Sequence, residues 1–128
     1  MPDRVQTAQL PAGPAAPAAA RSAITDWLSG TVDRQAIEDI KLLVSELVTN
    51  AVRHPRQTGT IAMDVSIIDG HVRVEVSDPG GGEFRKLAVT APPPDALGGR
   101  GLLIVDRVAT RWGVKPGRPT RVWFELER

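Results

Sequence analysis

The 128-residue chain contains no cysteine and only two histidines, His54 and His71. Disulfide bonds, cysteine-ligated zinc and cysteine nucleophiles are therefore excluded, and a histidine-rich metal site is not expected. No apolar run approaches the ~20 residues that a membrane-spanning helix needs. The N-terminus also lacks the charged-then-apolar pattern of a secretory signal. We therefore expect a cytoplasmic protein that does not contact a membrane.

The chain also lacks a strong excess of charge of either sign. Sixteen Lys and Arg residues stand against fifteen Asp and Glu residues, which leaves a net charge of +1. The basic residues are scattered, and the basic stripe that is typical of nucleic-acid-binding proteins is missing. We therefore expect no direct contact with nucleic acid.

The first half of the chain is predicted to be mainly helical. Residues 5–10 are interpreted as a short edge strand or a tail. A helix is expected to follow, with Pro14 in its first turn, where a missing N–H costs nothing, and to end near Leu28. Asp33 is a candidate N-cap for a second helix, in which apolar residues recur at three- and four-residue steps. Pro55 is expected to end this helix, because the residue before a proline disfavours helical dihedrals.

The second half is predicted to consist mainly of strands. Four segments are predicted strands: 61–67, 72–76, 111–114 and 121–126. Asp69-Gly70, between the first two, is typical of a tight hairpin turn. Residues 79–99 are rich in Pro and Gly and contain no predicted element, as is common for functional loops. A further helix is expected at 101–108.

This order of elements predicts an α+β fold. Helices would pack on one face of a mixed, mostly antiparallel sheet, which gives a two-layer α/β sandwich. With 128 residues, 41% of them hydrophobic, the chain has room for one core. We divide it into residues 1–9, a tail or edge strand, and one domain at 10–128.

The first group of candidate functional residues lies in the second helix, in the segment ELVTNAVRH at 46–54. Glu46 and Asn50 are four residues apart, so they project from the same side of the helix, and Arg53 continues that side. The Glu46 carboxylate could accept a proton, the Asn50 amide oxygen suits Mg²⁺ and the Arg53 guanidinium suits phosphate. The alternative interpretation is a polar, solvated helix face.

The second group is the segment DPGGG at 78–82, directly after a valine-rich strand. Asp78 at the strand end could accept a hydrogen bond from an exocyclic amine. Glycines beside it allow the backbone to approach a ligand closely. The alternative interpretation is an ordinary turn that ends the strand.

The third group is the segment GGRGLLIVD at 98–106, in which glycines open an apolar helix. Free backbone N–H groups at a helix N-terminus form a ready phosphate site. The alternative is a flexible loop before a packed helix. Neither the P-loop pattern nor the GxGxxG fingerprint occurs in the sequence, so neither of these phosphate cradles is expected.

Taken in order, the three segments resemble the conserved boxes of the GHKL ATPases, the superfamily of gyrase, chaperone and histidine-kinase ATPase domains. Residues 46–54 look like the N-box, Asp78-x-Gly80-x-Gly82 looks like the G1 box, and Gly99-x-Gly101 looks like the G2 box. The resemblance runs from about Leu10 to Leu126, and it is greatest to the stand-alone anti-sigma factor serine kinases. It implies the Bergerat (GHKL ATPase) fold.

The resemblance also implies a role for each residue. Glu46 would be the general base, Asn50 would hold Mg²⁺ on the phosphates of ATP, and Arg53 would contact those phosphates. Asp78 would bind the adenine amine, and residues 83–97 would form a lid over ATP. The remaining residues implied to contact the nucleotide are Gly80, Gly82, Gly98, Gly99, Arg100, Gly101, Leu102 and Thr120.

Two functions agree with this resemblance. The first is an ATP-dependent serine/threonine kinase that phosphorylates an anti-anti-sigma protein of the STAS type, sequesters a sigma factor and works as a homodimer. The second is a non-catalytic regulatory module whose bound ATP controls partner binding. A sensor histidine kinase is disfavoured, because the chain lacks a phosphoacceptor helical hairpin.

Overall fold

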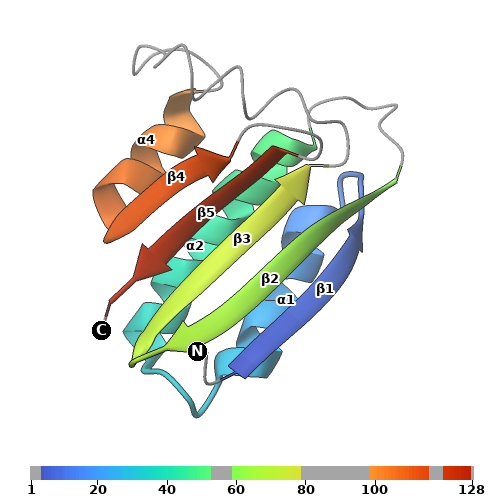
Figure 1. Cartoon of the computed structure of the whole chain (residues 1–128). Coiled ribbons are helices and arrows are strands. Elements are labelled where there is room, and N and C mark those ends of the chain that lie inside the picture. The colour runs from blue at the N-terminus through green and yellow to red at the C-terminus, as the bar shows by residue number, and fades with distance from the viewer. Residues whose placement is uncertain (1–3, 53–58, 79–98, 116–119, 128) are drawn as a thin grey trace.

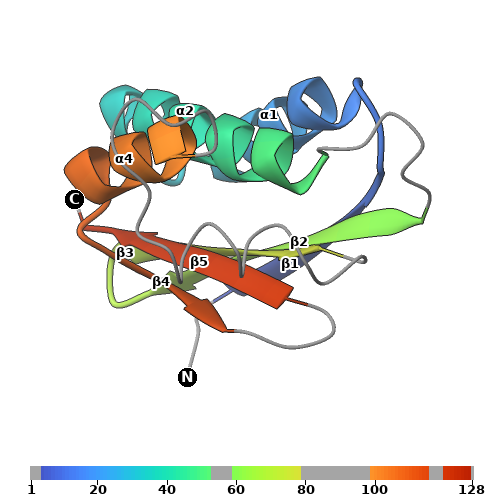
Figure 2. The ribbon, with the colours of Figure 1, turned by 90° about the horizontal axis from the view of Figure 1, so that it is seen from above.

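The computed structural model describes residues 4–52, 59–78, 99–115 and 120–127. Its helices and strands, in chain order, are β1 (Arg4–Pro11), α1 (Ala16–Leu28), α2 (Arg34–Ala51), β2 (Thr60–Ile68), β3 (His71–Asp78), α4 (Gly99–Val108), β4 (Arg111–Lys115) and β5 (Thr120–Leu126). They form two layers, with the helices on one side and the sheet on the other (Figure 2). The predicted α/β sandwich is therefore confirmed.

The strands form one sheet in the order β1-β2-β3-β5-β4 (Figure 1). All four pairings between neighbouring strands are antiparallel. The predicted mostly antiparallel sheet is confirmed, and the strands in the described ranges contain no parallel pair. β5 lies between β3 and β4, so the last strand of the chain occupies an inner position.

The β2–β3 hairpin has the turn that the sequence predicts. Asp69 and Gly70 both have positive φ, at 48° and 83°. Both central residues of a type I′ turn require positive φ, which glycine adopts freely and aspartate tolerates. The two strands pair from the residues that flank the turn, with Ile68 opposite His71.

Each of the two long helices agrees with the prediction at one end and differs from it at the other, and α1 ends at Leu28 as predicted. Asp33 caps α2 as predicted, since its Oδ1 accepts a hydrogen bond from the Ala36 N–H at 2.7 Å. α2 ends at Ala51, which is earlier than predicted, and Pro55 itself lies outside the described residues. The placement of Pro14 was wrong, because α1 begins at Ala16 and the proline in its first turn is Pro17.

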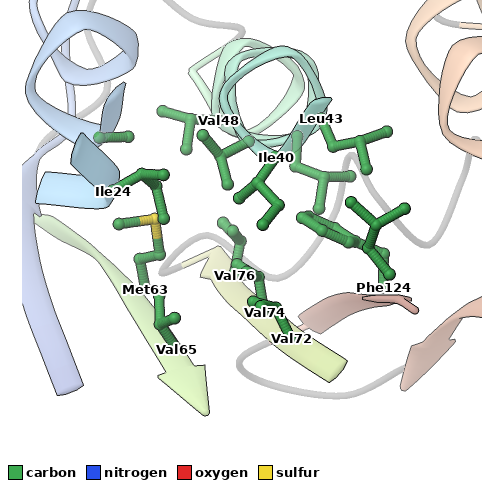
Figure 3. Packing of buried hydrophobic residues seen from close by; sticks show 14 of the residues in the cluster. Ile24, Ile40, Leu43, Val48, Met63, Val65, Val72, Val74, Val76 and Phe124 are labelled. Atoms are coloured by element: carbon green, nitrogen blue, oxygen red, sulfur yellow. The ribbon is translucent and has the colours of Figure 1, made fainter. Parts of the chain in front are cut away.

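The core lies between the sheet and the helices (Figure 3). Alternate residues of β3 and β5, among them Val74, Val76 and Phe124, point toward α2 and are fully buried. Ile40 and Leu43 meet them from α2. Within the described residues, no helix is both long and apolar enough to cross a bilayer.

Candidate functional site

Four element ends meet at one end of the molecule. The C-terminal ends of α2 and β3 lie there, together with the first residues of α4 and β5 (Figure 1). α2 packs against α4 and also contacts β3 and β5. The three segments that the sequence singled out are therefore brought to the same region, although they are far apart in the chain.

The wall of this region on the α2 side carries the predicted Glu46 and Asn50. Asn50 lies in the last turn of α2 and is only 5% exposed. Glu46, one turn earlier, is half-buried and so keeps part of its surface exposed to solvent. A buried amide in a helix that otherwise buries aliphatic residues is unusual, since burial of a polar group is costly unless it is engaged. This burial favours a specific role for Asn50 over the solvated-face interpretation.

The sheet side of the region is built by β3 and β5. Asp78 is the last residue of β3, as predicted, and it pairs directly with Thr120, the first residue of β5. Thr120 is completely buried. The pairing brings two predicted site residues side by side from segments that are 42 positions apart.

The two helix ends at this site have opposite polarity. The C-terminal end of a helix carries a partial negative charge and the N-terminal end a partial positive charge. The last turn of α2 has no basic residue, and the first turn of α4 has no acidic residue. Neither partial charge is therefore neutralised within its own turn. A cation bound near Asn50 and a phosphate bound near Gly99 would both be favoured.

Several predicted site residues lie outside the described part of the structure. These are Arg53, Gly80, Gly82 and Gly98, and the predicted lid at 83–97. The backbones of Asp78, Gly99, Arg100, Gly101 and Leu102 belong to described elements, whereas the side chains of Asp78, Arg100 and Leu102 are not described. The contacts assigned to all of these residues stay predictions.

Two contacts that hold the site helices in place were not foreseen. Trp112 Nε1 of β4 donates a hydrogen bond to Asp106 Oδ1 of α4 at 2.9 Å. Arg21 of α1 donates a hydrogen bond at 3.0 Å to Oγ of Ser45, the residue of α2 that precedes Glu46. The sequence carries no signal for either contact, because each depends on how two elements are placed relative to one another.

The residues present fit a nucleotide-bound Mg²⁺. In the part of the chain that is described, no group of three or more His, Asp or Glu side chains could hold a metal. Mg²⁺ bound to a nucleotide does not need one, because phosphates and water supply most of its ligands and one or two protein oxygens suffice. Asn50 can supply such an oxygen, next to the negative end of α2.

Comparison with known proteins agrees with this geometry. The sequence model of one protein family, the histidine kinase-like ATPase domain, matches residues 10–124 of this chain. A protein of Listeria innocua named serine-protein kinase RsbW is 38% identical over 88 residues, which cover 62% of this chain and 53% of that protein. The anti-sigma F factor of Clostridium botulinum (strain Eklund 17B / Type B) is 41% identical over 58 residues, which cover 43% of this chain and 39% of that protein. The chain thus spans about half or less of these curated relatives.

Solved structures share the fold. The crystal structure of the RsbU and RsbW domains of a Mycobacterium tuberculosis protein matches 98% of this chain and 33% of its own, with a TM-score of 0.74 and 23% identity. The histidine kinase domain of a blue-light-activated kinase from Erythrobacter litoralis matches 88% of this chain and 59% of its own, with a TM-score of 0.59 and 26% identity. The resemblance stated from the three segments is confirmed, and the chain belongs to the family of histidine kinase-like ATPase domains.

Proposed function

We propose that this chain is an ATP-dependent protein serine kinase and anti-sigma factor. It would phosphorylate a STAS-type anti-anti-sigma protein, sequester a sigma factor and act as a homodimer in the cytoplasm. The observation that carries the proposal is that the C-terminal part of α2, with Glu46 and Asn50, lies at the same end of the molecule as the paired residues Asp78 and Thr120 (Figure 1). The names of the relatives support it, since they include a serine-protein kinase and an anti-sigma factor.

The proposed reaction moves the γ-phosphoryl group of ATP to a serine hydroxyl. The hydroxyl oxygen attacks the γ-phosphorus, the bond to the oxygen that bridges the β- and γ-phosphates breaks, and ADP leaves. The proton of the hydroxyl goes to the Glu46 carboxylate. Such a reaction needs mainly positioning and charge stabilisation, and the half-buried Glu46, one turn from the buried Asn50, would supply the proton acceptor.

The other residues would hold the nucleotide. Asp78, at the end of β3, would accept a hydrogen bond from the adenine amine, with the buried Thr120 beside it. The N-terminal turn of α4 would bind phosphate through its free N–H groups. Asn50 would hold Mg²⁺, which when bound neutralises phosphate charge.

The kinase assay combines the purified chain with labelled ATP, Mg²⁺ and a cognate anti-anti-sigma protein. The unmodified chain should label a serine of that protein. Glu46→Gln should lower the rate by roughly 10²–10⁴-fold, the usual contribution of a general base, and should leave ATP affinity nearly unchanged. Glu38→Gln is the matched control, because Glu38 lies on the same helix, is exposed and contacts only Lys41 at 3.5 Å among the contacts of the described residues.

The outcome also separates the two functions that the sequence left open. Bound ATP without label on any anti-anti-sigma protein would favour the non-catalytic module and overturn the kinase. Equal loss of transfer in the Glu38 and Glu46 variants would overturn the role of Glu46.

A further inference from the structure

The side of α2 that points away from the sheet carries one exposed leucine. In the helix layer α2 packs against α1 on one side and α4 on the other, so only its outer face is left uncovered by these elements (Figure 2). Leu42 lies on this face and is 43% exposed, and among the described residues only Val5 is another exposed large hydrophobic residue. A single exposed leucine is common on protein surfaces, so its meaning depends on its neighbours.

Leu42 lies between two carboxylates. Residues three and four positions apart are neighbours on a helix surface, which places Asp39 on one side of Leu42 and Glu46, the proposed general base, on the other. Asp39 Oδ1 accepts a hydrogen bond from the neutral Gln35 side chain at 3.0 Å. Among the described residues, no cation lies within ion-pair distance of Asp39 or Glu46. The surface beside Glu46 therefore combines an apolar side chain with uncompensated negative charge.

This surface is turned away from α1. The residues that directly precede its three members face α1, since Glu38 and Lys41 line a hollow beside that helix and Ser45 is hydrogen-bonded to Arg21. Each following residue is rotated by about 100° around the helix axis. Glu38, the control residue of the kinase assay, therefore lies on a different side of α2 from the surface around Leu42.

A protein substrate of the proposed kinase would have to cover this surface. Its serine hydroxyl must reach Glu46, and Leu42 lies one turn, about 6 Å, further along α2. A protein interface of standard size buries about 800 Å² on each partner, which extends well beyond one side chain. The proposed nucleotide lies in the other direction along α2, near Asn50, so the body of the substrate has its room on the side of Leu42.

We propose that Leu42 and Asp39 form the docking surface for the body of the substrate protein. The proposal rests on the proposed function and adds what this substrate must carry. An apolar side chain about 6 Å from its reactive serine would pack on Leu42, and a basic side chain about 10 Å from that serine would pair with Asp39. An apolar centre with a polar rim is the usual construction of a protein interface, and complementary charge selects the partner.

Steady-state kinetics test the proposal, with the anti-anti-sigma protein that the unmodified chain labels as the varied substrate. Loss of a docking contact should raise the KM for this protein and leave kcat nearly unchanged, because the contact is the same before and during the reaction. Leu42→Ala should raise this KM at least about fivefold through lost apolar burial. Asp39→Asn should raise it about two- to fivefold, as expected for a partly exposed ion pair. Neither variant should change the affinity for ATP.

Each variant has a matched control on the outer face of the sheet. Val5→Ala shortens the other exposed large hydrophobic residue of the described chain. Asp64→Asn changes a carboxylate that, like Asp39, is half-buried and accepts a hydrogen bond from an uncharged side chain, here Thr7 Oγ1 at 2.8 Å. Both controls should leave the KM for the substrate protein unchanged.

An unchanged KM in either docking variant, or an equal rise in its control, would overturn the docking surface and leave the kinase in place. A chain that transfers no phosphate would overturn the kinase instead. Calorimetric titration of each STAS-type protein of the same organism into the chain, with ATP and Mg²⁺ present, then tests docking by itself. Leu42→Ala should weaken such binding at least about fivefold; equal binding by the variant, or no binding to the unmodified chain, would overturn the docking surface as well.

Discussion

At the scale of single residues, Trp123 has a tightly defined place on the outer face of the sheet. The guanidinium of Arg73, from β3, lies 4.3 Å from the centre of the indole ring, a distance typical of a cation–π contact. On the β4 side, Gly113 is the direct pairing partner of Trp123. A Cβ atom at Gly113 would lie 3.0 Å from the ring, so the indole occupies the space that a side chain would take.

This arrangement makes Gly113→Ala a destabilising change. The added methyl group must displace the indole, whose other side is occupied by Arg73, and overpacking of this kind costs about 1–3 kcal/mol. Urea unfolding should show a loss of this size, with a change in tryptophan fluorescence. Gly13→Ala is the control, because nothing lies within 4 Å of a Cβ atom there; equal stability of the two variants would contradict the account.

Residues whose role depends on their near neighbours could be predicted from the sequence. The Asp33 cap, the Asp69-Gly70 turn and the position of Asp78 at a strand end follow from patterns within a few residues. The need for glycine at Gly113 could not be predicted, because it arises from Trp123, ten positions away on another strand. The same holds for the hydrogen bond between Trp112 and Asp106.

At the scale of elements, β3, β4 and β5 are joined on the outer face by a group of ion pairs around Glu125. Its Oε2 accepts a hydrogen bond from Arg73 at 3.0 Å, and its Oε1 accepts one from Arg111 at 2.9 Å. His71 Nε2 lies 3.8 Å from the same carboxylate. Burial raises the pKa of Glu125 as the largest single effect, but the hydrogen bonds and charges of Arg111 and Arg73 together outweigh it and lower this pKa.

The lowered pKa predicts how stability depends on pH. A carboxylate with a depressed folded pKa stabilises the fold above its unfolded pKa, about 4.3 for glutamate, and this contribution is lost as pH falls through the folded value. Glu125→Gln should therefore lower the Tm by a few degrees at pH 7, and the difference from the unmodified chain should shrink toward pH 3. Glu127→Gln, at an exposed residue 3.5 Å from Arg111, should change the Tm little. A difference that persists undiminished at pH 3 would argue against this role of Glu125.

Element types were easier to predict than element ends. The helical spacing of apolar residues in α2 and the alternation in β2, β3 and β5 identify these elements, because each buries one side against a common core. Ends depend on weaker preferences. Two prolines, Pro14 and Pro17, lie near the start of α1. Pro14 lies in the turn before the helix, in which the Ala16 N–H donates a hydrogen bond to the Gly13 carbonyl at 3.0 Å. The proline in the first turn of the helix is therefore Pro17.

At the scale of the whole molecule, the site depends on the placement of β5 between β3 and β4. Because β5 pairs with β3, Thr120 lies beside Asp78. The helix α4, which precedes β4 and β5 in the chain, packs against α2. Strand order could not be predicted from the sequence, since it is decided by pairings between distant segments. Local patterns in the sequence could not predict that the three segments come together, whereas the resemblance to GHKL ATPases did. The ends of the described elements that lead into or out of these segments lie at one end of the molecule.

The central claim is that these element ends together bind a magnesium nucleotide, and calorimetry tests it most directly. ATP titrated into the chain with Mg²⁺ should give a heat of binding at one site per chain. Asn50→Ala should weaken that binding at least tenfold, which corresponds to about 1.4 kcal/mol, whereas Thr49→Ala, at the exposed neighbouring residue, should leave it unchanged. Absence of heat from both ATP and ADP in the presence of Mg²⁺, with the chain folded, would contradict the account.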